Sequence, residues 1–461
     1  LRSHRAAILG VILILLAVVV RLIGLSLDSL WYDEVFSVRA ARISVSAIIR
    51  LATSDVHPPL YSLLLHFWIK LFGETESAVR LLSVCFSVLT VLVVYRLALK
   101  LFNHRVAFFA ALFTTLSPLH VFYAQEARMY AQLTFFAASS VYFFVYWLKD
   151  GGRISSALYV ISTALLLYTH IYAAFVVLAQ LLYFASLFFL AREAFQKRLR
   201  RWLAIQFITG LLFSPWMLII IRQALKARRG FWIEEPDWLA PFQTLIEYCG
   251  SLWLALIILP LFVYGLKRCF KPSDKDTIDS LPHLGAFLLL WLILPIGVPF
   301  FLSKLTTPFY LTKYTIAASL PFYLFAACGL DRVRGVAWQA ILVLLICVCF
   351  GTELSRDLSA LKRERWRDAA YNLEQAAQAG DLVLFNSTGS YMSFAHYAKR
   401  KDMNSAVFPY SATDEQPPSE LISLQRYIVE GFGSVHPPQT EQETKEKLQT
   451  IVGERRRVWI V

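Results

Sequence analysis

The chain consists mainly of long apolar runs separated by short polar or charged segments. About 20 consecutive apolar residues are enough to cross the hydrocarbon of a bilayer as an α-helix. Eleven runs come close to that length, and each is predicted to be a membrane-spanning helix. They cover residues 7–27, 80–99, 105–122, 131–148, 154–169, 172–191, 202–221, 247–266, 284–302, 314–330 and 336–353. The pattern therefore predicts a mainly α-helical, polytopic membrane protein.

The polar segment after the first span contains two shorter helical patterns. Residues 58–72 form an apolar run of about 15 residues, which is short for a span. Residues 34–50 carry apolar side chains at helical spacing, with polar side chains on the opposite face. We therefore expect two juxtamembrane helices within the first outer loop, residues 28–79. The first run is too long for the apolar part of a signal peptide, so it is interpreted as a retained span.

Basic residues set the predicted orientation of the spans. If residues 58–72 lie on the membrane surface, the strongly basic short turns fall on the side of the N-terminus, with one exception. These turns are Lys100 to Arg105, Lys149 to Arg153, Arg192 to Arg201, Lys267 to Lys275 and Asp331 to Arg334. The positive-inside rule then predicts a cytoplasmic N-terminus and an extracytoplasmic C-terminus in a cell membrane.

The net charge of +13 is explained by these turns and by attraction to anionic membrane lipid, so no nucleic-acid partner is predicted. The exception is an outer cluster that either binds a phosphate-bearing ligand or contacts lipid headgroups. It consists of Arg222, Lys226, Arg228 and Arg229.

The composition changes near residue 354. Overall, 57% of the residues are hydrophobic and the mean hydropathy is +0.54, but residues 355–461 are rich in charge. A helical pattern at 366–379 precedes strand-like runs at 382–385 and 457–461. We predict a transmembrane domain over residues 1–354 and a small soluble α/β domain on the extracytoplasmic side over residues 355–461.

An acidic pair, Asp33 and Glu34, directly follows the first span. A carboxylate beside hydrocarbon costs a few kcal/mol, so its default interpretation is functional. Asp33 could take a proton from a hydroxyl nucleophile, or it could simply cap the helix that follows. His57 precedes Pro58 and Pro59 at the far end of the same loop. It could bind a sugar or phosphate or ligate a metal, or it could be a solvated side chain at a helix start.

Two later outer turns carry further candidates. Glu126, Arg128 and Tyr130 lie between two spans; Glu126 and Arg128 are two residues apart and cannot face each other on one helix. Either each has a separate functional partner or they form interhelical ion pairs. His170 marks another turn, for which a plain polar turn residue is the favoured interpretation.

The last candidates are Tyr310, Lys313 and Tyr314, at the start of the tenth span. Lys313 could clamp a lipid phosphate, or its chain could extend harmlessly to the membrane boundary. The sequence contains no GxGxxG, Walker A, HExxH or paired CxxC pattern.

At these residues the chain resembles the GT-C membrane glycosyltransferases, in the branch of the protein O-mannosyltransferases and the lipid A aminoarabinose transferases. The resemblance covers approximately residues 7–335. It rests on Asp33-Glu34, His57-Pro58-Pro59, Arg80-Leu81-Leu82-Ser83, the segment Gln125 to Tyr130, and Lys313-Tyr314 ahead of Pro321.

The resemblance implies that a sugar is transferred from a polyprenyl-phosphate-linked donor to an unknown acceptor on the extracytoplasmic face, with inversion. It implies Asp33 as the base, Glu34 as its support and Glu126 as a positioning group. Arg128 and Lys313 would neutralise the departing phosphate. Relatives often have Arg-Tyr where this chain has Lys313-Tyr314, so bidentate phosphate binding is not available there.

The remaining predicted substrate contacts are His57, Tyr130, His170, Tyr310 and Tyr314. No metal or other cofactor is required by this chemistry, although divalent ions serve some members of the superfold.

Two other classes of function compete with a transferase. A lipid or solute transporter would place polar residues and broken helices at mid-membrane, often in repeated halves. A non-catalytic assembly protein could keep the same fold. The transferase hypothesis instead requires Asp33, Glu126 and Lys313 to converge on one outward-facing cavity.

Overall fold

The structure is a computed structural model that describes residues 2–227, 233–270, 284–359, 364–379, 381–385, 387–400, 404–407 and 457–460. The chain forms two compact units. The helical unit comprises residues 1–23, 80–221 and 233–360. The mixed unit comprises residues 24–79, 222–232 and 361–461.

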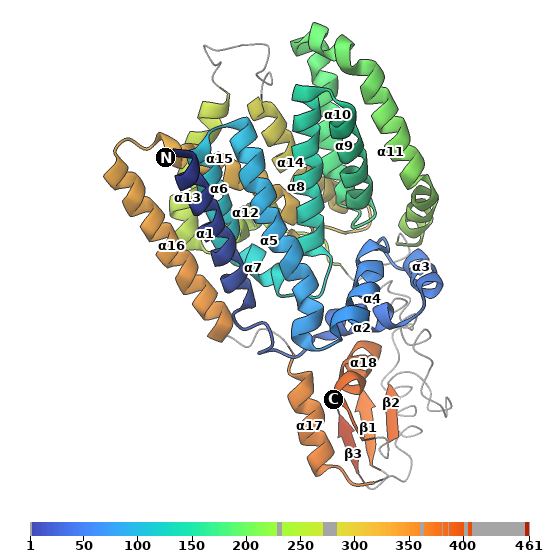
Figure 1. Ribbon diagram of the computed structural model, residues 1–461. Coiled ribbons are helices and arrows are strands. Elements are labelled where there is room, and N and C mark those ends of the chain that lie inside the picture. The colour runs from blue at the N-terminus through green and yellow to red at the C-terminus, as the bar shows by residue number, and fades with distance from the viewer. Residues whose placement is uncertain are drawn as a thin grey trace. The chain divides into compact units, whose positions relative to one another are not determined.

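The helical unit is a bundle of long apolar helices with several short helices between them (Figure 1). Its elements, two of which begin or end in the mixed unit, are α1 (Arg2–Leu22), α5 (Glu76–Leu101), α6 (His104–Leu116), α7 (Pro118–Ala124), α8 (Tyr130–Asp150), α9 (Arg153–Leu167), α10 (Ala173–Leu190), α11 (Arg192–Ala227), α12 (Ala240–Cys249), α13 (Leu252–Cys269), α14 (Leu284–Leu305), the 3₁₀ helix η1 (Thr312–Ala318), α15 (Ser319–Arg332) and α16 (Val336–Ser359).

The mixed unit combines three short helices of the first loop with a small α/β domain. Its elements are α2 (Tyr32–Arg42), α3 (Val45–Ser54), α4 (Leu60–Phe72), α17 (Trp366–Ala376), β1 (Leu382–Phe385), α18 (Thr388–Tyr397), β2 (Asn404–Val407) and β3 (Val458–Ile460). The strands are parallel in the order β2-β1-β3, with Leu382 opposite Asn404 and Val458. Leu373, Val383, Phe385 and Phe394 belong to the apolar core between sheet and helices. The helix and the two strands predicted beyond residue 354 are present, and their ends differ from the predicted ones by at most three residues.

Each of the eleven predicted spans coincides with a helix or with two consecutive helices. Among the described residues, eight helices are long and apolar enough to cross a membrane, and the bent pair α6–α7 makes a ninth if it counts as one span. The apolar parts of α1 and α9 are shorter. The fold class is therefore confirmed, whereas the count of eleven spans is not.

Two helix boundaries differ from prediction. Residues 34–50 were expected to form one helix, but α2 ends at Arg42 and α3 begins at Val45. Ser44 caps α3, because its hydroxyl accepts a hydrogen bond from the amide of Ala47. The predicted span 247–266 is interrupted at Gly250, whose φ of +93° lies in the region that favours glycine.

α13 and α15 cross in close backbone contact at two glycines. A Cβ atom on Gly265 would overlap the carbonyl oxygen of Phe325, and one on Gly329 would overlap that of Leu261. Only glycine permits this backbone approach. The two glycines consequently allow α13 and α15 to pack with their backbones in contact.

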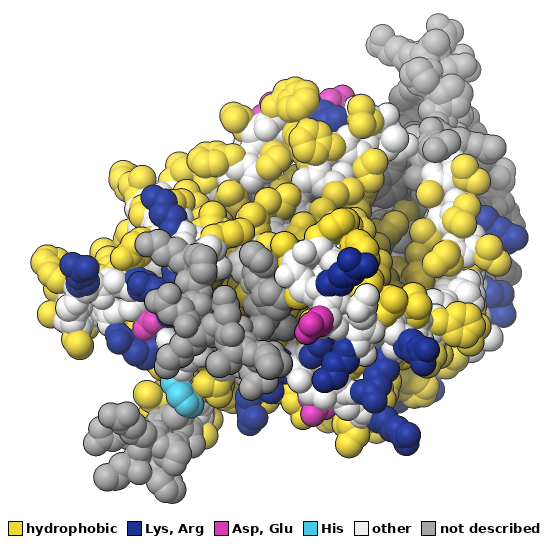
Figure 2. Space-filling model, turned by 90° about the horizontal axis from the view of Figure 1, so that it is seen from above, with side chains coloured by type: hydrophobic (Ala, Val, Ile, Leu, Met, Phe, Trp, Pro, Cys, Tyr) yellow, Lys and Arg dark blue, Asp and Glu magenta, His cyan; other side chains and the backbone are white. Residues whose placement is uncertain are grey.

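The basic turns lie together at one end of the helical unit, where α5, α8, α10 and α15 end (Figure 1). Figure 2 looks down on this end and shows more Lys and Arg than Asp and Glu side chains. The predicted orientation depends on this placement of the basic turns at one common end. Which side of the membrane it faces stays a prediction.

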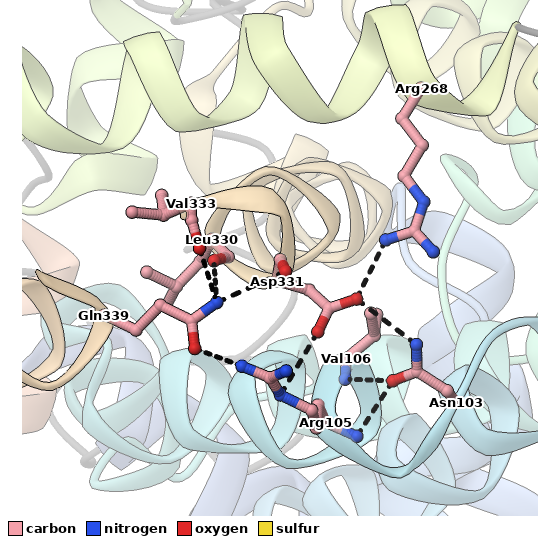
Figure 3. Close-up of polar contacts among 8 residues, drawn as sticks. All are labelled: Asn103, Arg105, Val106, Arg268, Leu330, Asp331, Val333 and Gln339. Atoms are coloured by element: carbon pink, nitrogen blue, oxygen red, sulfur yellow. Dashed lines mark hydrogen bonds and ion pairs between the residues drawn. The ribbon is translucent and has the colours of Figure 1, made fainter. Parts of the chain in front are cut away.

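Contacts of Asp331, through its side chain and its backbone carbonyl, connect four helices at this end (Figure 3). Its carboxylate accepts hydrogen bonds from Arg268 on α13 at 2.9 Å and from Asn103, just before α6, at 3.2 Å, and it lies 3.3 Å from Nε of Arg105 on α6. Gln339 of α16 donates to the carbonyl oxygens of Leu330, Asp331 and Val333 at the end of α15. One carboxylate thus joins α6, α13 and α15, and α16 is joined to them through Gln339.

Candidate functional site

A break between α6 and α7 precedes the turn that carries Glu126 and Arg128. The two helices bend by 56° at Ser117 and Pro118. Proline has no N–H, so the carbonyl of Thr114, four residues earlier, loses its usual helical donor. Arg21 of α1 supplies the replacement, because its Nη2 donates to that carbonyl at 3.1 Å.

Arg21 is fully buried and makes three further hydrogen bonds. It donates to the carbonyl of Thr115 at 3.1 Å, to the hydroxyl of Ser87 at 2.7 Å and to the carbonyl of Ala17 at 3.1 Å. Gln125, just after α7, donates in return to the carbonyls of Arg21 and Ile23. This network fixes α7 and therefore the start of the turn that carries Glu126 and Arg128.

A buried chain of hydroxyl groups links the same break to η1. Ser117 and the hydroxyl of Tyr323 are 2.7 Å apart, Tyr323 donates to the carbonyl of Tyr248, and Tyr248 donates to the carbonyl of Thr315. His120 Nε2 lies 2.8 Å from the hydroxyl of Ser319 at the start of α15. The turn after α7 and the 3₁₀ helix η1 are therefore held in one frame.

Five predicted site residues from separate parts of the chain meet in the helical unit. The ring of Tyr314 stacks on that of Tyr130 at 6.1 Å and lies 4.7 Å from that of His170. Lys313 Nζ is 5.6 Å from the centre of the Tyr130 ring and 5.7 Å from that of Tyr314. The positive charges of Arg128 and Lys313 both contribute to lowering the pKa of His170.

This group, which we call the cationic aromatic cluster, consists of Arg128, Tyr130, His170, Lys313 and Tyr314. Arg128 is buried, whereas Lys313 is partly exposed and places its positive charge beside two of the rings. Such a cluster is chemically suited to hold an anionic group such as a phosphate.

Glu126 and Arg128 occupy the tight turn between α7 and α8. Both side chains are buried, at 1% and 8% exposure. The amide of Arg128 donates to the carbonyl of Glu126 at 2.8 Å, and the hydroxyl of Ser83 donates to the carbonyl of Arg128 at 3.2 Å. The turn is thus fixed by α5 as well as by its own backbone.

Tyr310 lies at the edge of this region. Its hydroxyl is 2.6 Å from that of Thr244 on α12, and Thr244 is 3.0 Å from the hydroxyl of Thr312. Burial raises the pKa of Tyr310 to about 12. Tyr310 therefore holds the segment before η1, and it is a neutral hydrogen-bonding group at physiological pH.

The acidic pair lies in the mixed unit, where its two carboxylates have different surroundings. Trp31, not Asp33, is the N-cap of α2, so the predicted capping role of Asp33 is wrong. Glu34 makes the capping contact instead, accepting from the amide of Trp31 at 3.4 Å, and it is fully buried. Asp33 is only partly buried, in the first turn of α2. The helix is therefore capped without Asp33.

His57 also belongs to the mixed unit and lies just before the two prolines, with Pro59 as the N-cap of α4. Gln223 of α11 holds the preceding segment by donating to the carbonyls of Ala52 and Asp55. Of the outer basic cluster, Arg222 is exposed, whereas Lys226, Arg228 and Arg229 lie outside the residues whose side chains are described. Whether the cluster binds a phosphate-bearing ligand or lipid headgroups stays a prediction. The expected convergence of Asp33 with Glu126 and Lys313 stays a prediction.

His170 is buried, and its pKa is lowered to about 3 by burial first and then by the charges of Arg128 and Lys313. Its Nδ1 accepts a hydrogen bond from the amide of Tyr172 at 3.1 Å, as a neutral imidazole can. His170 thus lies in the turn between α9 and α10, buried beside aromatic rings, and its contact with a substrate stays a prediction.

This depressed pKa predicts a pH-dependent stability. Below about pH 6.5 an unfolded histidine binds a proton, whereas His170 in the folded protein does not until about pH 3. Stability is therefore lost as the pH falls through this window. We expect His170→Gln to flatten the decline of the melting temperature between pH 6.5 and 4. The control is His104→Gln, which makes the same substitution at an exposed histidine. An equal slope for wild type and His170→Gln would contradict the prediction.

Two features of the site were not predicted from the sequence. The first is Tyr172, which packs against the cluster. Its ring lies 5.4 Å from that of Tyr314, and its hydroxyl donates a hydrogen bond to the carbonyl of Phe309 at 2.9 Å. Arg21 is the second, and a signal for it existed. An arginine within an apolar run is expensive in a membrane and is functional by default.

Comparisons with known proteins relate this architecture to a family and to solved structures. The family model described as dolichyl-phosphate-mannose-protein mannosyltransferase matches residues 56–219. The oligosaccharyltransferase of Archaeoglobus fulgidus, solved with a tethered acceptor peptide, superposes with a TM-score of 0.56 at 12% identity. The superposition covers 93% of this chain and 68% of that one.

ArnT from Cupriavidus metallidurans, solved with bound undecaprenyl phosphate, gives a TM-score of 0.53 at 13% identity, covering 96% of this chain and 84% of that one. This chain has the GT-C fold. The mycobacterial arabinofuranosyltransferase AftD shares the fold with a TM-score of 0.51 at 15% identity, over 88% of this chain and 33% of that one. No curated protein matches the chain.

Within the GT-C fold of this chain, the described residues contain no group of three or more His, Cys, Asp or Glu side chains that could hold a metal ion.

Proposed function

We propose that this protein transfers a sugar from a polyprenyl-phosphate-linked donor to an acceptor hydroxyl on the extracytoplasmic membrane face, with inversion at the anomeric carbon. The observation that carries the proposal is the cationic aromatic cluster of the helical unit, which combines the charges of Arg128 and Lys313 with three aromatic rings. The GT-C fold supports it, because relatives of this fold have been solved with undecaprenyl phosphate and with a dolichol-phosphate.

The proposed reaction is a single displacement. The acceptor oxygen gives its proton to Asp33 and bonds to the anomeric carbon, while the bond from that carbon to the phosphate oxygen breaks. The electron pair of that bond stays on the departing polyprenyl phosphate, which gains one negative charge. Because catalysis depends on charge placed where charge develops, Arg128 and Lys313 are assigned to this phosphate.

The other candidates take supporting roles in this proposal. Glu34 holds the first turn of α2, and Glu126 orients donor or acceptor at the turn before α8. His170, as a neutral imidazole, and Tyr130, Tyr310 and Tyr314 line the donor site, and His57 contacts the substrate from the mixed unit. The proposal invokes no metal ion.

The test is a transfer assay on the full chain in lipid nanodiscs. Polyprenyl-phosphate pentoses and hexoses are the donors, a membrane extract supplies acceptors, and released polyprenyl phosphate is measured. We expect release that depends on both donor and extract. Movement of intact donor across proteoliposomes without release would favour a transporter, and neither activity would favour an assembly protein.

The assay also isolates the proposed phosphate site. Lys313→Met should lower kcat/KM by about 10²- to 10³-fold, the usual cost of removing one preorganised charge contact. Lys304→Met is the matched control, because Lys304 also lies over an aromatic ring, that of Trp238, and is not a member of the cationic aromatic cluster. Equal activity of the two variants would remove Lys313 from the site.

A further inference from the structure

The α/β domain contacts the backbone that leads into α2 at three neighbouring residues, all within the mixed unit. The hydroxyl of Tyr397 accepts a hydrogen bond from the amide of Leu30 at 2.7 Å. Ser29 donates to the carbonyl of Glu364 at 2.5 Å, and Arg367 donates to the carbonyl of Leu27 at 3.0 Å. Every one of these partners lies between residues 364 and 397.

Two of these side chains, those of Tyr397 and Arg367, also bind one carboxylate. Glu76, the first residue of α5, accepts from the hydroxyl of Tyr397 and from Arg367, both at 3.2 Å. Tyr397 thus uses its single hydroxyl as acceptor for Leu30 and donor to Glu76. The side chain of Glu76 is 19% exposed and Leu30 is fully buried, whereas the side chain of Arg367 is 44% exposed, so the contacts of Tyr397 are the more shielded part of this group.

The contacts at residues 27–30 lie directly before the start of α2. Leu30 directly precedes Trp31, the N-cap of α2, and Asp33 is the second residue of that helix. α18 also packs against α2 itself. Fixing the backbone at residues 27–30 therefore fixes the direction in which α2 starts, and with it the carboxylate of Asp33.

We propose that the C-terminal α/β domain is a positioning element for Asp33, and that Tyr397 is its central positioning residue. This inference rests on the proposed function for its effect on turnover, but the contact itself is independent of any activity. It assigns a role to residues 364–397 that concerns the geometry of the base rather than recognition of the acceptor.

The test compares Tyr397→Phe with Tyr391→Phe in the full chain. Both tyrosines lie on α18, and the hydroxyl of Tyr391 makes no hydrogen bond to another described residue. Amide hydrogen exchange is measured over residues 24–36, and kcat and donor KM are measured in the transfer assay. We expect Tyr397→Phe to speed exchange in this segment and to lower kcat about 10-fold with an unchanged donor KM, because a small misplacement of a reacting group is costly.

Each arm can overturn the proposal separately. Unchanged exchange in Tyr397→Phe would show that the contact does not hold the segment. Faster exchange with an unaltered kcat would show that the contact is structural and does not position Asp33. If the wild-type protein transfers no sugar, the proposed function fails, and the exchange measurement still decides whether the domain fixes residues 27–30.

Discussion

Replacing Asp33 with Asn is expected to lower the rate of sugar transfer by about 10²- to 10⁴-fold, the usual contribution of a positioned general base. Asparagine keeps the size and shape of the side chain but cannot take the acceptor proton. Capping should survive, because Glu34 and Trp31, not Asp33, form the capping contacts of α2. The loss should therefore appear in kcat, with the melting temperature and donor KM little changed.

The matched control is Asp237→Asn, at an exposed aspartate that caps a turn by accepting from the amide of Leu239 at 2.7 Å. Asparagine can make the same contact, so this variant should keep full turnover. Wild-type turnover in Asp33→Asn would exclude Asp33 as the base and leave Glu126 as the candidate to test next.

Replacing Arg21 with Met is expected to lower the stability of the helical unit by about 2 kcal/mol or more. Methionine fills similar space but donates no hydrogen bonds, and each buried acceptor left unpaired costs about 1–3 kcal/mol. The affected acceptors are the carbonyls of Thr114 and Thr115 and the hydroxyl of Ser87. Pro118 cannot supply the missing donor to Thr114.

The measurement is the free energy of unfolding in mixed micelles titrated with SDS. Arg96→Met serves as the control, because Arg96 is exposed on α5 and has no hydrogen bond or ion pair with another described residue. A loss in Arg21→Met no greater than that in Arg96→Met would show that the break between α6 and α7 is held by other contacts.

The helices were predictable from the sequence because membrane burial acts on each run locally. The breaks within runs were not, since apolar spacing continues across them. Val35, Ala41, Val45 and Ile48 keep a helical period although the chain turns at residues 43 and 44. Ser44, like Ser117 before Pro118, was the available signal for such a break.

The candidate site was predictable in part for a related reason. Counting spans placed Arg128, His170 and Lys313 at the same ends of helices, and the structure brings them together within the helical unit. Their supports could not be inferred, because they depend on contacts between distant segments, such as Arg21 with Thr114. Nor does the sequence say which hydroxyl pairs link α12 to η1.

The Asp331 cluster has a mechanical consequence. It joins α6, α13, α15 and α16 where α15 ends, whereas the cationic aromatic cluster lies where α8 and α15 begin. α15 is therefore held to neighbouring helices at both of its ends, by the Asp331 cluster at the end of the helix and by the contacts Ser117–Tyr323 and His120–Ser319 beside the candidate site. The start of α15 consequently gives the candidate site a support that does not depend on the Asp331 cluster.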